Sequence, residues 1–212
     1  MKQQHMTAEE YRAATAHEYD RSRANRGKPF EDLLLFIHES YQQKGRAVVH
    51  KVPTEFIPLR DHTGSVCGVK VERKSCVDYL GRYGATAVAV EAKHTEDTRI
   101  RWDRVEDHQA DFMDDFCIQP QAVGIVLVSF GLRRFFAVPW AAWRAGRQAW
   151  SAAAPRTRPT PTQVDSGGLL WTPPPRASVT AEELPPEWEI RPGGGLALPY
   201  LDIIDKWRPD NG

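Results

Sequence analysis

The sequence predicts an α/β domain in which a β-sheet is flanked by helices, and three observations support this fold class. An amphipathic helical pattern over residues 30–44 precedes the first apolar strand. Two strand-like stretches over 76–80 and 85–92 are joined by a glycine-bearing turn at 81–84, which is typical of a β-hairpin. The most apolar stretch of the chain, 123–130, follows a second helical pattern and is expected to be a buried strand.

The first helix is indicated by an apolar stripe at three- and four-residue spacing, which includes Leu33, Ile37 and Tyr41. Pro29 suits the first turn of this helix, and Gly45 suits its end. The other expected elements are strands over 47–51, 76–80, 85–92, 123–130 and 135–138, short β-prone pieces over 54–75, and helices over 103–116 and 140–150.

The chain is expected to consist of a core with appended segments. A short helix is predicted near 7–19, Thr180 with Glu183 predicts another helix start, and 201–207 predicts a final amphipathic turn or helix. The expected segments are a polar, basic arm over 1–24, a core over 25–150, a Pro-rich loop or insertion over 151–176, and a segment over 177–212 that packs on the core.

Composition excludes few function classes. The 28 basic and 28 acidic residues balance to a net charge of +0, so any nucleic-acid contact has to come from local basic patches. The three cysteines, Cys67, Cys76 and Cys117, form no C-x-x-C pair, which argues against a zinc site and against a disulfide framework. The polar start of the chain and the lack of a long apolar run predict a cytoplasmic protein without membrane contact.

Two carboxylates and a lysine are expected to converge at the hairpin over 76–92. Glu91 and Lys93 project from the same face of one strand, and the hairpin folds Asp78 back towards them. Glu91 ends a buried-looking run, where a charge needs a partner or a metal. Hard oxygen donors suit Mg²⁺, and a nearby lysine suits phosphodiester hydrolysis. A surface salt bridge among the three side chains remains the alternative interpretation.

The D…E-x-K string resembles the signature of the PD-(D/E)XK nucleases, and the chain more narrowly resembles the RecU family of Holliday junction resolvases. The short segments that carry this resemblance, in chain order, are Asn25-Arg26-Gly27 with Phe30-Glu31-Asp32, Ala47-Val48-Val49-His50-Lys51 with Pro53-Thr54, Asp78-Tyr79, Glu91-Ala92-Lys93, His108-Gln109 and Leu201-Asp202-Ile203-Ile204-Asp205. Each is weak alone, and their ordered occurrence is specific.

The resemblance implies a restriction-endonuclease-like mixed central sheet flanked by helices, with a projecting β stalk over 55–75. It further implies that Asp78, Glu91 and the Ala92 carbonyl bind Mg²⁺, with Mn²⁺ as a substitute, and that Lys93 serves the attacking water. It also places Glu31 near the metal, although a helix-start carboxylate is an equal alternative for that position.

The same resemblance implies roles for further residues and shows one departure from the family pattern. Gln109 is expected to orient water or phosphate, with a plain polar helix position as its alternative. The family usually has Thr before the catalytic Asp, where this chain has Val77. The residues expected to contact DNA are Arg26, Lys51, Arg60, Lys70, Arg73 and Lys74.

The function expected from the resemblance is resolution of four-way DNA junctions by a homodimer that makes symmetric paired incisions with 5′-phosphate products, in association with a RecA-like recombinase. A two-fold symmetric junction suits a two-fold symmetric dimer. Two alternatives remain open: another PD-(D/E)XK nuclease of restriction or repair type, and a non-catalytic DNA-binding or recombinase-modulating protein.

Overall fold

The computed structural model describes residues 27–151, 164–166, 169–191, 193 and 195–207. The expected helix near 7–19, the arm over 1–24 and Arg26 therefore lie outside the described residues. Within the described part of the chain, no helix combines the length and the apolar character that are needed to cross a membrane.

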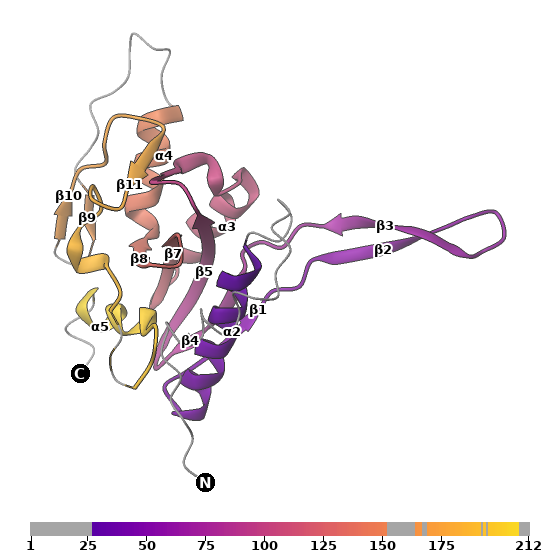
Figure 1. Ribbon diagram of the computed structural model, residues 1–212, viewed down its shortest axis with the longest axis horizontal. Helices are drawn as coiled ribbons and strands as arrows, with labels where there is room; N and C mark the ends of the chain where they lie inside the picture. Colours follow the sequence, from indigo (N-terminus) through magenta and orange to yellow (C-terminus); the bar gives the residue numbers. More distant parts are fainter. Residues whose placement is uncertain (1–26, 152–163, 167–168, 192, 194, 208–212) are drawn as a thin grey trace.

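A five-stranded mixed sheet forms the centre of the fold (Figure 1). Its strands, in spatial order, are β1 (Ala47–Lys51), β4 (Tyr79–Tyr83), β5 (Thr86–Thr95), β7 (Ala122–Phe130) and β8 (Arg134–Pro139). Strands β5 and β7 are parallel, and the other neighbours are antiparallel. The predicted mixed sheet flanked by helices is thus confirmed.

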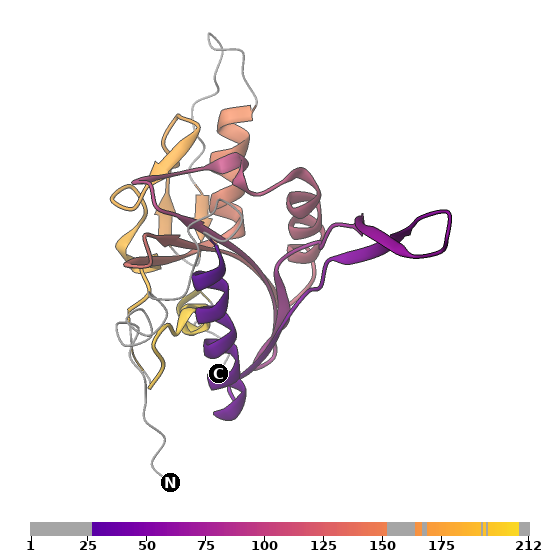
Figure 2. The ribbon, with the colours of Figure 1, turned by 45° about the vertical axis from the view of Figure 1, so that its right-hand side comes forward.

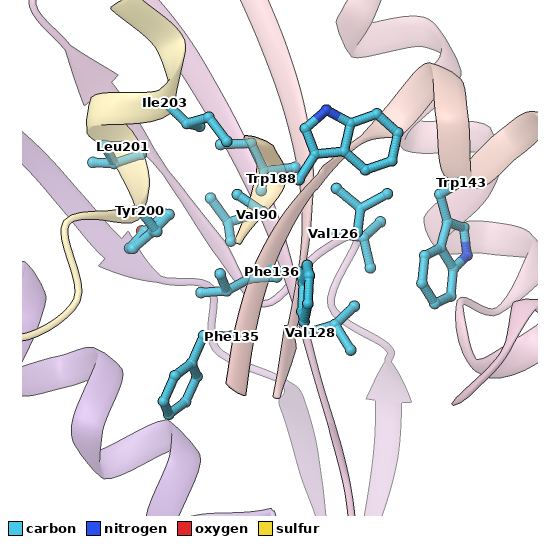
Figure 3. Packing of buried hydrophobic residues seen from close by; sticks show 14 of the residues in the cluster. Val90, Val126, Val128, Phe135, Phe136, Trp143, Trp188, Tyr200, Leu201 and Ile203 are labelled. Atoms are coloured by element: carbon cyan, nitrogen blue, oxygen red, sulfur yellow. The ribbon is translucent and has the colours of Figure 1, made fainter. Parts of the chain in front are cut away.

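Helices cover both faces of this sheet. Helix α2 (Lys28–Gln43) lies on one face and buries Leu34, Ile37 and Tyr41, which belong to the predicted apolar stripe and its neighbours. Helices α3 (Asp107–Cys117) and α4 (Trp140–Ser151) contact β7 on the other face. The buried side chains between these layers form one continuous core, to which Trp188 and Tyr200 of the C-terminal segment also contribute (Figure 3).

A two-stranded hairpin projects from the sheet (Figures 1 and 2). It consists of β2 (Glu55–Arg60) and β3 (Val66–Arg73), which pair only with each other. The turn between them is stabilised by Asp61, whose carboxylate accepts hydrogen bonds from the backbone N–H groups of Thr63 and Ser65. This hairpin is the projecting stalk that the resemblance implied.

The predicted turn at 81–84 is wrong in its extent, because β4 continues through Tyr83. Gly81 stands in the sheet between Val49 and Val88, and the reversal is confined to Gly84, which has φ +55°, and Ala85. A glycine in a short turn-like sequence predicts a turn, but here its missing side chain serves the close approach of β1. The strand also begins at Tyr79 rather than at residue 76.

Two further expectations need correction. The helix expected over 103–116 begins later, because a 3₁₀ turn (Trp102–Arg104) precedes α3. The helix start expected at Thr180 is the end of β11 (Ser178–Thr180). The Glu183 carboxylate does accept the backbone N–H of Thr180, but Pro185 and Pro186 allow only a 3₁₀ turn (Pro186–Trp188).

The loop expected over 151–176 contains regular structure where it is described. Strands β9 (Val164–Ser166) and β10 (Leu169–Trp171) pair with each other, and the Trp171 ring contacts that of Trp188. Strand β11 pairs with β6 (Arg99–Arg101), and the chain continues through a 3₁₀ turn (Tyr200–Asp202) into α5 (Ile203–Trp207). Apolar contacts between distant residues order these short strands, and local periodicity does not reveal such contacts.

Candidate active site

Strand pairing brings Asp78, Glu91 and Lys93 together. The Glu91 side chain is 0 % exposed, and its Oε1 accepts a hydrogen bond from Lys93 Nζ at 2.5 Å. Its Oε2 accepts the backbone N–H of Asp78 at 3.2 Å. The Asp78 Oδ2 accepts the backbone N–H of Ala92 at 2.9 Å, so the two carboxylates are held on adjoining strands by each other's main chain.

The two carboxylates raise each other's energy when both are ionised. Burial, and then the negative charge of Asp78, raise the pKa of Glu91 to about 7, while Lys93 opposes this shift. Metal ligation relieves such a conflict, because a divalent cation neutralises both charges. Among the described residues, Lys93 is the group that forms an ion pair with Glu91, and a cation that contacts both carboxylates would relieve the remaining repulsion.

The chemistry of the donors fits Mg²⁺. Among the described residues, no group of three or more His, Cys, Asp and Glu side chains is placed to hold a metal ion. Mg²⁺ commonly takes one or two protein carboxylates and completes its shell with water and phosphate oxygens, so two carboxylates beside an open cleft are sufficient. This donor set favours a hard oxygen-binding cation over zinc, since no cysteine or histidine joins it.

An open cleft of about 520 Å³ gives access to Asp78. Of the residues predicted for the site, Glu31, Asp78, Ala92 and Lys93 line the cleft. Glu91 and Gln109 do not line it and lie behind it in the protein interior. Asp78 and Lys93 are therefore the members of the cluster that a ligand in the cleft can approach directly.

Gln109 has both ends of its side-chain amide engaged. Its Nε2 donates to Glu91 Oε1 at 2.8 Å, and its Oε1 accepts the backbone N–H of Glu106 in a capping box at the start of α3. The sequence favoured a role in orienting water or phosphate. The geometry instead has Gln109 orient the Glu91 carboxylate and link it to the first turn of α3.

Glu31, on α2, also lines the cleft. Its carboxylate accepts a hydrogen bond from Lys51 Nζ at 2.5 Å, and both side chains are about half exposed. The ion pair joins the start of α2 to the end of β1. Glu31 thus borders the same cleft as Asp78, whereas Lys51 does not line the cleft and is joined to it through this ion pair.

The other predicted basic residues gather around the stalk. Lys74 at its base is exposed and pairs with Glu106. Arg60 and Lys70 are exposed on the hairpin, and Arg60 donates to the Gly64 carbonyl in the turn. Arg73 ends β3. These positions lie on the hairpin or at its base, and none of them lines the cleft.

Arg104 was missed by the sequence analysis. It lines the cleft together with His94, Glu96 and Asp97, and its guanidinium donates to the His94 carbonyl at 3.3 Å. The 3₁₀ turn that carries it is anchored by the buried Trp102, so its position depends on packing far from the D…E-x-K string. None of the short motifs in the sequence includes Arg104, so the sequence around it gave no indication that it would line the cleft.

Val77, the departure from the family pattern, is fully buried in the core. It precedes β4, which begins at Tyr79, and it does not line the cleft that Asp78 lines. This chain therefore has a packed core side chain at the position where the family usually has a hydroxyl.

Comparison with known proteins gives one family. Residues 25–156, more than half of the chain, match the model of the family described as RecU, Recombination protein U. A Holliday junction resolvase RecU of Lactobacillus delbrueckii subsp. bulgaricus is 26 % identical over 192 residues, which cover 86 % of this chain and 80 % of that protein. One from Streptococcus pneumoniae is 31 % identical over 113 residues, which cover 50 % of this chain and 57 % of that protein.

A solved structure, that of Hjc, a Holliday junction resolvase of Archaeoglobus fulgidus, is also similar. It matches with 16 % identity and a TM-score of 0.34, covering 52 % of this chain and 74 % of that one. The family match includes α2, the stalk and every residue of the carboxylate and lysine cluster. The chain described here is therefore a member of the RecU family.

Proposed function

We propose that this protein is a Mg²⁺-dependent endonuclease that resolves four-way DNA junctions by symmetric paired incisions, with Mn²⁺ able to replace Mg²⁺. The observation that carries the proposal is the convergence of Asp78, Glu91 and Lys93 beside an open cleft. The family membership and the printed names of the relatives support a junction as the substrate.

Each residue of the cluster has a separate task in the proposed reaction. Asp78 and Glu91 would hold the cation, which would supply an acidified water and neutralise charge that develops on the phosphate. Lys93 Nζ, which already donates to Glu91, is placed to orient the attacking water or to stabilise the phosphate anion. Gln109 keeps the Glu91 carboxylate in one orientation. In-line attack at phosphorus would leave a 5′-phosphate and a 3′-hydroxyl.

The stalk is the feature that suits a branched substrate better than a plain duplex. No described residue of the stalk belongs to the buried core, so its strands have no role in holding the domain together. Arg60 and Lys70 offer positive charge to phosphates, and Phe56 and Val69 offer exposed apolar contact. A projection of this kind can enter the open centre of a junction, where four strands meet. A homodimer would present two clefts to opposing strands, and a RecA-like recombinase is a proposed partner in the same process.

The proposal predicts a substrate preference. In Mg²⁺, a four-way junction should be cut at paired symmetric positions at least about tenfold faster than duplex or single-stranded DNA of matched sequence. EDTA should abolish all cleavage, because the proposed reaction takes its acidified water from the bound cation. Equal rates on duplex, flap and junction DNA would contradict the proposal and support a restriction-type or repair nuclease.

A stalk-trimmed variant sharpens this test. Lys51 and Tyr79 are paired neighbours at the base of the hairpin, so a short Gly-Ser link can replace Glu55–Arg73 without separating β1 from β4. We expect the trimmed protein to fold with an unchanged circular dichroism spectrum and to lose its preference for junctions. A trimmed protein that still prefers junctions would remove the stalk from the proposed recognition.

A further inference from the structure

The last residues of β5 have one edge that no described strand covers. The pairing of β4 with β5 ends at Val90, so beyond it β5 has a neighbouring strand on the β7 side only. Successive residues of a strand direct their backbone N–H and C=O groups to opposite sides. The Thr95 carbonyl accepts the Gly131 N–H at 2.8 Å, on the β7 side. The backbone groups of Ala92 and His94 are therefore directed to the open edge.

Asp78 and Arg104 occupy successive places along this edge. The Asp78 carboxylate accepts the N–H of Ala92 at 2.9 Å. The Arg104 guanidinium donates to the carbonyl of His94 at 3.3 Å. The two backbone places are two residues apart, which is roughly 7 Å at about 3.3 Å per strand residue. Both side chains line the cleft, as Lys93 does, so a ligand that reaches Asp78 and extends towards the end of β5 meets Arg104.

The backbone that carries Arg104 is fixed by its neighbours. Trp102 and Val105 are completely buried. The Trp102 indole N–H donates to the Arg176 carbonyl at 2.8 Å, and the Trp102 carbonyl accepts the Trp143 indole N–H at 3.1 Å. A side chain on such a turn loses less freedom on binding a ligand than a side chain on a mobile loop.

The positive charge of Arg104 is available to a ligand. In the part of the chain that the structure describes, Arg104 takes part in no ion pair, whereas the nearby Arg101 is paired with Asp103. Its hydrogen bond to the His94 carbonyl uses one terminal nitrogen. A guanidinium has several further N–H donors, arranged in a fork that matches two oxygens of a phosphate.

The other charges in the cleft decide which anion can reach Arg104. The cleft is also lined by the carboxylates of Glu31, Asp78, Glu96 and Asp97, which repel a free anion. A phosphate within a DNA strand is instead brought there by its covalent neighbour. The separation of successive phosphates along one strand is similar to that of the two backbone places on β5, so one phosphate beside Asp78 puts the next within reach of Arg104.

We propose that Arg104 binds the phosphate next to the scissile phosphate and thereby sets the register of the cut strand in the cleft. The inference rests on the proposed function, because a scissile phosphate beside Asp78 and Lys93 defines which phosphate is its neighbour. The role differs from that of Lys93, whose amino group donates to Glu91 at the proposed cation site.

Neutral phosphates in the substrate test this contact. Single-turnover cleavage in Mg²⁺, at protein concentrations below saturation, is compared on an unmodified junction and on junctions with one methylphosphonate immediately 5′ or 3′ of the scissile phosphate. One of the two should slow the wild type at least about tenfold, as expected for a lost charge-assisted hydrogen bond. Arg104→Ala should be slowed similarly on the unmodified junction. The same methylphosphonate should then slow this variant by less than about twofold more, because the contact is already absent.

Arg99→Ala is the matched control. Arg99 is exposed on β6 and does not line the cleft, so its removal takes away the same charge elsewhere. It should keep the wild-type rate and the wild-type response to both methylphosphonates. The proposal is overturned if Arg104→Ala cuts the unmodified junction at the wild-type rate, or if its loss multiplies with that of each methylphosphonate, as a purely structural role would require.

Binding in EDTA separates this contact from the proposed nuclease activity. The slope of the logarithm of junction affinity against the logarithm of salt concentration should be smaller by about 0.9 for Arg104→Ala than for the wild type, as for one lost phosphate contact. Arg99→Ala should keep the wild-type slope. A wild type that cuts no DNA, with this change of slope in Arg104→Ala, would contradict the proposed function and leave the contact standing. An unchanged slope would contradict the contact, even if the variant cuts slowly.

Discussion

Asp78→Asn should reduce the rate of Mg²⁺-dependent junction cleavage on the order of 10³-fold or more, which corresponds to about 4 kcal/mol of activation free energy. The substitution removes the charge of one of the two carboxylates while keeping an oxygen that can accept the Ala92 N–H bond. The fold should therefore persist, and the loss should fall on chemistry rather than on binding. Single-turnover cleavage rates and gel-shift affinities for the same junction separate the two effects.

The matched control for this variant is Asp103→Asn. Asp103 is an exposed carboxylate that pairs with Arg101 outside the cleft, so its change alters the net charge equally. We expect near wild-type cleavage from it. If Asp78→Asn retained cleavage within tenfold of the wild type, Asp78 would not be a metal ligand and the assigned centre would be wrong. If it lost junction binding in parallel with cleavage, the effect would be structural.

Gly81→Ala should destabilise the protein by about 3 kcal/mol or more, a loss typical of severe overpacking in a core. A Cβ at this position would stand 2.1 Å from the Val48 carbonyl oxygen and 2.6 Å from Val49 Cα. These are backbone atoms, so β1 and β4 would have to separate. The same ladder includes the bond from the Val52 N–H to the Asp78 carbonyl, and cleavage should fall with stability. Urea unfolding at equilibrium measures the change.

Gly68→Ala is the internal comparison for this prediction. Gly68 also lies in a strand, but a Cβ there would meet no atom closer than Leu59 Cδ1 at 3.9 Å. Its substitution should be neutral or slightly stabilising, because alanine restricts the unfolded chain more than glycine does. Equal unfolding midpoints for the two variants would mean that β1 can shift away from Gly81 at little cost.

The sequence was a good guide where chemistry depends on neighbours in the chain. Two-residue strand periodicity was sufficient to place Glu91 and Lys93 on one face, and the structure joins them by a hydrogen bond. The buried run before Glu91 predicted a carboxylate in need of a partner, and its raised pKa has that cause. Helix α2 and strand β7 could equally be predicted from the sequence, because the apolar pattern of each repeats within a few residues.

The sequence was a poor guide wherever a residue's role depends on a distant partner. Gly81 resembled a turn residue until β1 was placed beside it. Gln109 was expected to face water or phosphate, whereas its amide binds Glu91, which is 18 positions away. Arg104 lines the cleft although no local sequence pattern predicts it, because the packing of Trp102 positions the turn that carries it.

The difference between the features that the sequence predicted and those that it did not has one physical reason. Secondary structure and the alternation of side chains between the faces of a strand follow from backbone geometry, which acts over two to four residues. A local periodicity in the sequence therefore predicts them. The cleft, the second hydrogen bond to Glu91 and the placement of Arg104 all arise from long-range packing. Spacing alone could therefore predict that Asp78, Glu91 and Lys93 converge, while the tertiary structure decided that Asp78 and Lys93 line the cleft and Glu91 does not.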